Sequence, residues 1–441
     1  MHRICLTLPT NRACAGTISE IRAEAAYAAG HFDVEVHLLI LDSAERPVFA
    51  EHAKVVAEAQ PVPNVLVHHL DEAAQRDFLR RVIERAELPA ELPGPAALLD
   101  LMLPSGVSYG ACTNRAFLLA AALGCRSVHR RDSDSSYQLH DGEPVFPIHH
   151  ELASLGKRAL DAAAGVCETV LEPDQEQRPV VLVGSSFVGE LSVDISEIQR
   201  LDPEVYHEVV SLWAPFDRSA QEKRELVEES FRGAGTEPFT GDHSLLTVVD
   251  PMRVDMCNVS FHQVHEQVPL PPATDTIGSD YFLLHLVRDA QLPGVLHNRN
   301  IVNFYTGERR TDPGFLAYQL RFAKFFLSML YFNAIYRAMA EAGPSLLDEE
   351  YRVRVGAVTA LVRESVRLDR AENTSRLDVL DRCYRRLGGR YAAFADLLAG
   401  RRGELLDEAR SDIEDFARLI EAWEPLIRAS KATSVHQLPS R

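Results

Sequence analysis

The sequence predicts an α/β protein in which a mostly parallel sheet is flanked by helices, followed by an all-helical C-terminal region. Strand-like apolar runs and amphipathic helical segments alternate between residues 3 and 132. After about residue 312 the periodicity is helical almost to the end. The chain has 441 residues, of which 46% are hydrophobic, enough to bury a sizeable core and to form two structural units.

The N-terminal elements follow the alternation expected for strands joined by helices. The apolar run at 3–9 is typical of a buried strand, and a helix is expected at 17–30, where Thr17 and Glu20 have capping-box spacing. Later strands and helices alternate at 34–43 (strand), 46–59 (helix), 65–70 (strand), 71–86 (helix), 109–124 (helix) and 126–132 (strand). Such alternation favours parallel strands with helices on both faces.

The remaining elements divide the chain at about residue 312. Residues 1–311 carry further predicted strands at 180–194 and, after a Pro-Gly turn, at 295–305, and helices at 201–213 and 219–232. Residues 312–431 form the helical region, with helices at 314–343, 347–368, 377–400 and 404–430, and residues 432–441 are expected to be a frayed tail. We expect the helical region to pack on the α/β part. Its aromatic first helix could instead form a homodimer seam through Phe322, Phe325, Phe326, Tyr331, Phe332 and Tyr336.

The charge and cysteine pattern exclude several classes of protein. A formal net charge of -18 disfavours general attraction to nucleic acid or anionic membranes. The longest apolar stretch, residues 325–332, is too short to span a bilayer, and no signal peptide opens the chain. The seven cysteines are scattered without a CxxC pair, which is typical of reduced residues. We therefore expect a cytoplasmic protein with no membrane span.

Two acidic residues, Asp132 and Asp134, directly follow the predicted strand at 126–132 and form the only D-x-D in the chain. Neighbouring carboxylates repel, so near a core they need a cation or several hydrogen-bond donors to stay ionised. Ligands of open α/β sheets bind beyond the carboxyl ends of the strands, which is where this pair lies. The alternative is a solvated Asp/Ser turn in which the side chains cap backbone amides.

Polar residues also follow the other predicted strands. If the sheet is parallel, the residues at the strand ends and on the helix at 109–124 surround one rim: Asn11, Arg12, Asp42, Asn114 and Arg115. The two arginines could supply forked donors to a diphosphate. Each could equally be a surface arginine paired with an acid, and Asp42 could be a turn cap.

These stretches resemble the nucleotide-sugar-dependent glycosyltransferases of the GT-A fold, which is Rossmann-like. The resemblance is carried by "LPTNR" at 8–12, "LDS" at 41–43, "NRAFLLAAALG" at 114–124 and "RRDSD" at 130–134. Residues 255–305 look like the acceptor half of that fold. The resemblance implies a catalytic domain at 1–311, with a nucleotide-binding half at 1–140 and an acceptor half at 141–311.

The resemblance also implies an activity: metal-dependent transfer of a sugar from a nucleoside-diphosphate sugar to a small-molecule or glycan acceptor. Asp134 would bind Mn²⁺ or Mg²⁺ directly, and Asp132 would contact the ribose or a metal-bound water. His297 would reach the same metal, although a lone histidine on a strand is more often structural. Donor-binding residues would be Pro9, Thr10, Asn11, Arg12, Asp42, Asn114, Arg115, Asp132 and Arg299.

Asp280 matches the acidic residue of the acceptor half. It would be the general base if the reaction inverts the anomeric centre, and would position the sugar if the reaction retains it. Its competitor is Asp275, a candidate N-cap of the same helix. Two other functions compete with glycosyl transfer. A sugar nucleotidyltransferase usually opens with a Gly-rich loop, whereas this chain opens with "LPTNRACAG"; a non-catalytic binding protein would tolerate loss of Asp134, which is retained.

Overall fold

The molecule is built around one large mixed sheet, seen in a computed structural model that describes residues 1–191, 193–307 and 311–434. Within those residues nine strands pair in the order β3-β2-β1-β4-β12-β9-β13-β11-β8. They are β1 (His2–Thr10), β2 (Val34–Asp42), β3 (Val65–Leu70), β4 (Ser127–Arg131), β8 (Glu168–Thr169), β9 (Leu182–Gly184), β11 (Ser244–Thr247), β12 (Asn258–His262) and β13 (Gly294–His297). Five of the eight pairings are parallel.

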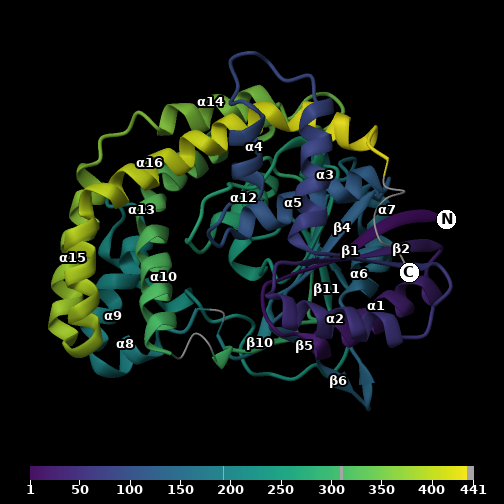
Figure 1. Ribbon diagram of the computed structural model, residues 1–441, viewed down its shortest axis with the longest axis horizontal. Coiled ribbons are helices and arrows are strands. Elements are labelled where there is room, and N and C mark those ends of the chain that lie inside the picture. Colours follow the sequence, from purple (N-terminus) through teal and green to yellow (C-terminus); the bar gives the residue numbers. More distant parts are fainter. Residues whose placement is uncertain (192, 308–310, 435–441) are drawn as a thin grey trace.

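The predicted fold class is confirmed. The parallel strands β1 to β4 are connected by α1 (Ala15–His31), α2 (Arg46–Glu58), α3 (Glu72–Arg85), α4 (Pro95–Met102) and α5 (Tyr109–Ala122). Successive β1 side chains face opposite sides of the sheet. Leu6 and Leu8 pack with Ile18 and Ile21 of α1, whereas Cys5 belongs to the core formed with α3 and α5. Helices therefore cover both faces (Figure 1).

The start of α1 differs from the prediction. The helix begins at Ala15, two residues earlier than expected, and its N-cap residue, Cys14, makes no side-chain capping bond. The hydroxyl of Thr17 instead donates to the carbonyl oxygens of Ser133 and Ser135, at 3.3 and 3.2 Å. The predicted capping box is therefore absent, and Thr17 ties α1 to the turn that carries the two acidic residues.

Short elements fill the middle of the chain. A small sheet of β10 (Phe187–Gly189), β14 (Ile301–Asn303) and β5 (Ser135–Tyr137) lies beside the acidic turn, because Asn303 pairs with Ser135 directly after Asp134. A hairpin is formed by β6 (Leu139–His140) and β7 (Glu143–Pro144). The helices here are α6 (Ile148–Ser154), α7 (Ala159–Ala162), α8 (Ser196–Leu201), α9 (Pro203–Val210), α10 (Ala220–Glu229), α11 (Val264–Gln267) and α12 (Phe282–Asp289).

The C-terminal region is helical, as predicted, but its breaks differ. It consists of α13 (Asp312–Ala342), α14 (Val355–Ser365), α15 (Ala371–Leu387) and α16 (Gly389–Lys431). The expected break between 400 and 404 does not occur, since α16 continues through Gly400 and Gly403. The chain turns instead at Gly388, whose φ of 72° is left-handed. Figure 1 shows α16, in yellow, crossing from α15 toward α3.

The helical region shares its core with the sheet. One continuous cluster of buried apolar residues includes Cys5 of β1, Phe117 of α5, Phe326 of α13 and Trp423 of α16. Of the six aromatic residues considered for a dimer seam, five are buried inside the subunit and Tyr336 is partly buried. These side chains are therefore not a surface for a second copy, which corrects that interpretation.

The C-terminal tail and the absence of a membrane span are also predicted from the sequence. Most of the predicted tail, residues 435–441, lies outside the described residues. The residues before it continue from α16, and the Thr433 hydroxyl donates to the carbonyl oxygen of Ala429 at 2.8 Å. No helix in the described parts of the chain is both long and apolar enough to cross a membrane.

Candidate functional site

Two cavities meet at the acidic turn after β4. We call the first the basic cavity, because four arginines contribute to its lining: Arg12, Arg115, Arg130 and Arg321. We call the second the aromatic cavity, because its lining includes Trp213, Phe231, Phe325 and Tyr336. Both cavities are lined by Tyr109, Asp132 and Asp134. The D-x-D pair therefore stands at the junction between a cationic space and an apolar one.

Seven of the residues predicted from sequence line the basic cavity: Pro9, Thr10, Asn11, Arg12, Arg115, Asp132 and Asp134. The end of β1 explains part of this arrangement. The Thr10 hydroxyl donates to the carbonyl oxygen of Arg12 at 3.0 Å and lies 3.3 Å from the Arg12 amide, which closes a tight turn. From this turn the Arg12 guanidinium reaches Asp134, with Nη1 2.7 Å from Oδ2.

Arg130 is the residue that lets several carboxylates coexist here, and sequence reasoning did not single it out. Its side chain is buried, with Nη2 3.1 Å from Oδ1 of Asp132 and Nη1 2.8 Å from Oδ2 of Asp280. Nη1 also donates to the carbonyl oxygen of Met256 at 3.0 Å. The signal was present in "RRDSD", since the residue stands immediately before the acidic turn and the acids require a cation.

The next residue of β4, Arg131, faces the other side of the sheet. Its guanidinium pairs with Glu24 at 2.8 Å and with Glu151 at 3.1 Å, and all three side chains are buried. Alternation along the strand thus separates two adjacent arginines into two independent charge networks. Among the described residues that line the two cavities, Arg130, Asp132 and Asp280 are present, and Arg131, Glu24 and Glu151 are not.

The carboxylates at the junction are partly or almost fully removed from water, and they repel one another. Burial raises the pKa of Asp132 to about 6; Arg130 opposes this rise, while Asp134, Asp255 and Asp280 add to it. Burial also raises the pKa of Asp280, again against the attraction of Arg130. Asp132, Asp134 and Asp280 share two guanidiniums, those of Arg12 and Arg130, so negative charge predominates among these paired groups. Oxygen donors with excess negative charge fit a hard divalent cation.

Asp255 and Tyr281 extend the acidic group into the aromatic cavity. The Tyr281 hydroxyl donates to Oδ2 of Asp255 at 2.8 Å, and Oδ1 accepts from the backbone amide of Cys257 at 2.9 Å. Both side chains line the aromatic cavity together with Asp280. Asp255 opens the sequence stretch assigned to the acceptor half, but no local motif distinguishes it from the other acids of this chain.

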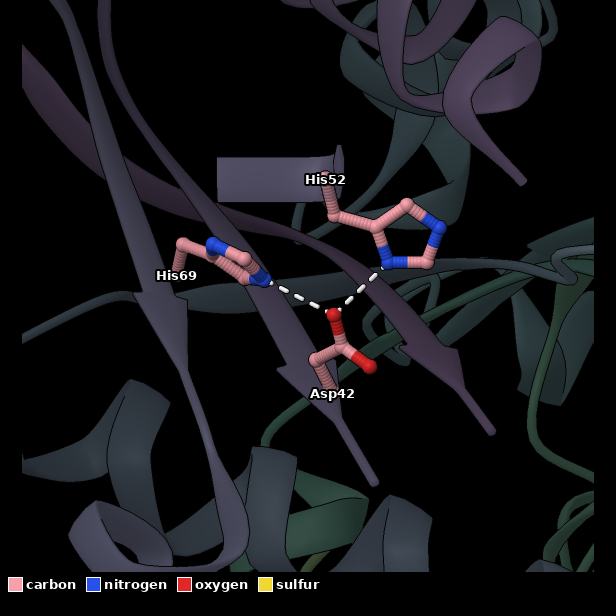
Figure 2. A group of neighbouring side chains, drawn as sticks. All are labelled: Asp42, His52 and His69. Atoms are coloured by element: carbon pink, nitrogen blue, oxygen red, sulfur yellow. Dashed lines mark hydrogen bonds and ion pairs between the residues drawn. The ribbon is translucent and has the colours of Figure 1, made fainter. Parts of the chain in front are cut away.

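Asp42 has a different environment from the one predicted. Its fully buried side chain accepts hydrogen bonds from Nδ1 of His52 at 2.7 Å and Nε2 of His69 at 2.8 Å (Figure 2). Burial raises the pKa of Asp42, but the hydrogen bonds from His69 and His52 outweigh this effect and lower it overall. The carboxylate has no exposed surface for a base or ribose, so we correct its role to an internal anchor at the end of β2.

The same three residues, Asp42, His52 and His69, have ligand atoms within 4.8 Å of one another, a spacing compatible with a metal ion. The second ring nitrogen of His52, Nε2, accepts from the backbone amide of Cys14 at 3.0 Å. That bond places the imidazole hydrogen on Nδ1, where it donates to Asp42. Metal binding at Nδ1 would move the hydrogen to Nε2 and break the bond to Cys14, so the cluster fits a hydrogen-bonded anchor better.

Asn114 also has an internal role. The residue is fully buried on α5, where its side-chain amide donates to the carbonyl oxygen of Leu270 and accepts from the Leu270 amide, both at 2.8 Å. It therefore pins the segment after α11 to α5. Because its polar atoms are engaged in the interior, we correct its predicted contact with a donor.

His297 and Arg299 lie away from both cavities, whose described lining residues include neither. His297 is buried on β13, where its ring stacks on His150 with centroids 5.4 Å apart and Nδ1 accepts from the Arg299 amide. Arg299 forms a bidentate pair with Asp242, at 2.6 and 2.8 Å. This arrangement corrects the predicted metal and phosphate contacts.

The fold and the cavities define an α/β protein with a cluster of acidic side chains at the carboxyl ends of parallel strands. The chain belongs to the family described as a family of unknown function (DUF6271), whose model matches residues 2–439. A search of curated proteins found no match.

Similarities to solved structures are weaker, and two of them are to a mannosyltransferase and a xylosyltransferase. A mannosyltransferase from Pyrobaculum calidifontis, in complex with GDP-Man and Mn²⁺, is 13% identical, with 95% of this chain and 85% of that chain covered at a TM-score of 0.35. Mouse xyloside xylosyltransferase 1, in its apo form, is 13% identical over 46% of this chain and 59% of that one, with a TM-score of 0.18.

Proposed function

We propose that the protein is a metal-dependent glycosyltransferase that moves a sugar from a nucleoside-diphosphate sugar to an acceptor. The observation that carries the proposal is the position of Asp132 and Asp134 at the junction of two cavities. Arginines line one cavity, as a diphosphate requires. Asp280 lines the other, as the acceptor of a hydroxyl proton requires.

The donor diphosphate would lie in the basic cavity. Arg115 is held there by hydrogen bonds from Nε to Gln75 at 2.8 Å and from Nη1 to the carbonyl oxygen of Met102 at 2.7 Å. These neutral oxygens orient the guanidinium without neutralising its charge. Burial lowers the pKa of Arg115, which favours an anion beside it, although an arginine stays protonated at neutral pH. Arg12 and Arg321 add charge to the same space.

Asp132 and Asp134 would hold Mn²⁺ or Mg²⁺. A bound divalent cation would neutralise charge that develops on the leaving diphosphate. In its absence Arg12 balances Asp134 and Arg130 balances Asp132. If a metal ion bound Asp134, the Arg12 guanidinium would be released and could bind a phosphate of the donor. The donor and the metal ion should therefore bind cooperatively.

Asp280 would serve the acceptor. It lies in a 3-10 turn, Ser279–Tyr281, directly before α12, and its Oδ2 atom is fixed by Arg130 at 2.8 Å. Its raised pKa makes the carboxylate more basic than an exposed aspartate. In an inverting reaction it would remove the proton of the acceptor hydroxyl; in a retaining reaction it would orient the transferred sugar.

Thermal unfolding in the presence of UDP-, GDP-, CDP- and dTDP-sugars, with and without Mn²⁺, tests the proposal because ligands of the native state raise the melting temperature. We expect one nucleotide class to stabilise the protein, and to do so more strongly with Mn²⁺. Asp134→Asn should abolish the Mn²⁺-dependent part. The matched control is Asp77→Asn, which changes a side chain that is 72% exposed. An unchanged Mn²⁺ effect in Asp134→Asn would overturn the proposed metal site.

A cytoplasmic location remains part of this proposal. Its support is that all seven cysteines are free in the structure, as in a reducing compartment. Fractionation of the native host with antibody detection would test it. Recovery outside the cytoplasm would contradict it.

A further inference from the structure

The aromatic cavity extends from the acidic junction into the helical region. Its apolar wall is formed by the ring of Trp213, whose centroid lies 5.4 Å from those of both Phe231 and Phe325. Ile277 and Met329 belong to the same lining. These residues come from four separate parts of the chain. The wall offers large apolar surfaces and few hydrogen-bonding atoms to a bound molecule.

The apolar wall adjoins the turn that carries Asp280. Gly278 stands two residues before Asp280 with a φ of +73°, and a Cβ atom there would lie 2.9 Å from the Phe325 ring. Only glycine allows this approach without strain. A ligand body resting against the Phe325 side of the cavity would therefore be within a short distance of the Asp280 carboxylate.

One face of α13 serves both cavities. Gly314, Tyr318 and Arg321 line the basic cavity, and Phe325, Met329 and Tyr336 line the aromatic cavity. Their spacing of three, four and seven residues is that of one helical face. The helical region is therefore a wall of the candidate site as well as a packing partner of the sheet.

His285 is a neutral polar residue of the lining, which also contains charged residues such as Glu229 and Arg232. Its ring stacks on Tyr336 with centroids 3.7 Å apart, and Nδ1 has no hydrogen-bond partner among the described residues. Burial lowers the pKa of His285 to about 3, so the imidazole is neutral at physiological pH. A neutral imidazole can make a single hydrogen bond to a polar substituent of an otherwise apolar ligand.

We propose that the acceptor is a flat, largely apolar molecule that carries a hydroxyl group, such as a phenol or a polycyclic alcohol, and not a free sugar. The proposal rests on the proposed glycosyl transfer. The lining is mixed, since it also includes Ser186, Glu229, Arg232 and Asn303, but the hydroxyl groups of a sugar that face the rings of Trp213, Phe231 and Phe325 would lack partners, which is unfavourable. An aromatic body gains from the same contacts, and its hydroxyl meets acceptor oxygens at Asp280 and Asp255.

Calorimetric titration of the full chain with 2-naphthol and with maltose tests this proposal without requiring turnover. We expect 2-naphthol to bind and maltose to give no heat. Phe231→Ala should weaken 2-naphthol binding by about tenfold or more, because it removes one ring of the wall. The matched control is Phe216→Ala, an aromatic residue that is 39% exposed and does not line the cavity.

A second variant tests the same cavity in case Phe231→Ala does not fold. Met252 lies in the lining with 37% of its surface exposed, so Met252→Asp should keep the fold, checked by its melting curve, and should also weaken 2-naphthol binding. Binding of maltose that is sensitive to Phe231→Ala, or 2-naphthol binding unchanged in both variants, would overturn the acceptor assignment. If the proposed glycosyl transfer is wrong, a different experiment shows it: no nucleotide sugar would raise the melting temperature in thermal unfolding.

Discussion

Replacing Arg130 with methionine should reveal how much the acidic junction depends on one buried cation. The side chain of Arg130 is 3% exposed and contacts Asp132 and Asp280. Removing one partner of a buried ion pair costs about 3–5 kcal/mol, because it leaves an uncompensated charge. Water reaches Asp132, whose side chain is 29% exposed, whereas Asp280 is 7% exposed. We therefore expect a loss near the lower end, about 3 kcal/mol at pH 8.

The loss of unfolding free energy in Arg130→Met should be larger at high pH than at low pH. Without Arg130, burial and the neighbouring carboxylates raise the pKa values of Asp132 and Asp280 in the folded state above those of the unfolded chain. A carboxyl group of this kind destabilises the folded protein fully above its folded pKa and progressively less as pH falls toward the unfolded value. The difference in unfolding free energy between wild type and Arg130→Met should therefore shrink from pH 8 to pH 5.

Urea unfolding followed by circular dichroism at both pH values measures this difference. Mn²⁺ should stabilise Arg130→Met more than it stabilises the wild type, because the ion replaces the missing charge. Arg131→Met is the matched control for the metal effect: it removes the neighbouring buried arginine from the network of Glu24 and Glu151 on the other face of the sheet, so Mn²⁺ should not stabilise it more than the wild type. A loss that is equal at pH 8 and pH 5, with no additional effect of Mn²⁺, would refute the reasoning.

Two further predictions concern single acids. Asp280→Asn should lower turnover by about 10²-fold or more at saturating donor and acceptor, with donor affinity unchanged, since the amide cannot accept the proton; near-wild-type turnover would exclude the role of base. Glu151 should stabilise the fold against acid: burial raises its pKa, but Arg131 and His129 outweigh this and lower it to about 2. That shift corresponds to a stabilisation of about 3 kcal/mol, present above the unfolded pKa and lost as pH falls toward 2. In urea unfolding between pH 5 and pH 3, wild type should lose more stability than Glu151→Gln, and parallel losses would contradict the assignment.

Local periodicity determined most of the element order. The helix predicted at 46–59 is α2 (Arg46–Glu58), and the strand predicted at 65–70 is β3 (Val65–Leu70). Such segments are readable because the spacing of apolar residues reflects which side of one element is buried. The predicted helix break near Gly403 is wrong. Glycine disfavours a helix only weakly, and burial of one face of α16 outweighs this effect.

The candidate site was predictable where it depends on the position of a strand end. Asp132 and Asp134 follow β4, and Arg12 follows β1, so their convergence results from parallel pairing of the two strands. The directions of side chains at Asn114 and His297 could not be read in this way. Each is turned toward the interior by packing against a segment distant in sequence, such as Leu270, which is 156 residues from Asn114.

By itself, the sequence determined the alternating α/β order, the helical C-terminal region and the acidic pair at a strand end, because these depend on neighbours a few residues apart. Tertiary structure alone decided that Arg130 bridges Asp132 and Asp280, which lies 150 residues from it, and that Trp213, Phe231 and Phe325 form one wall. Contacts across such separations arise when whole elements pack against one another. The free energy of that packing cannot be predicted from the periodicity of any single segment.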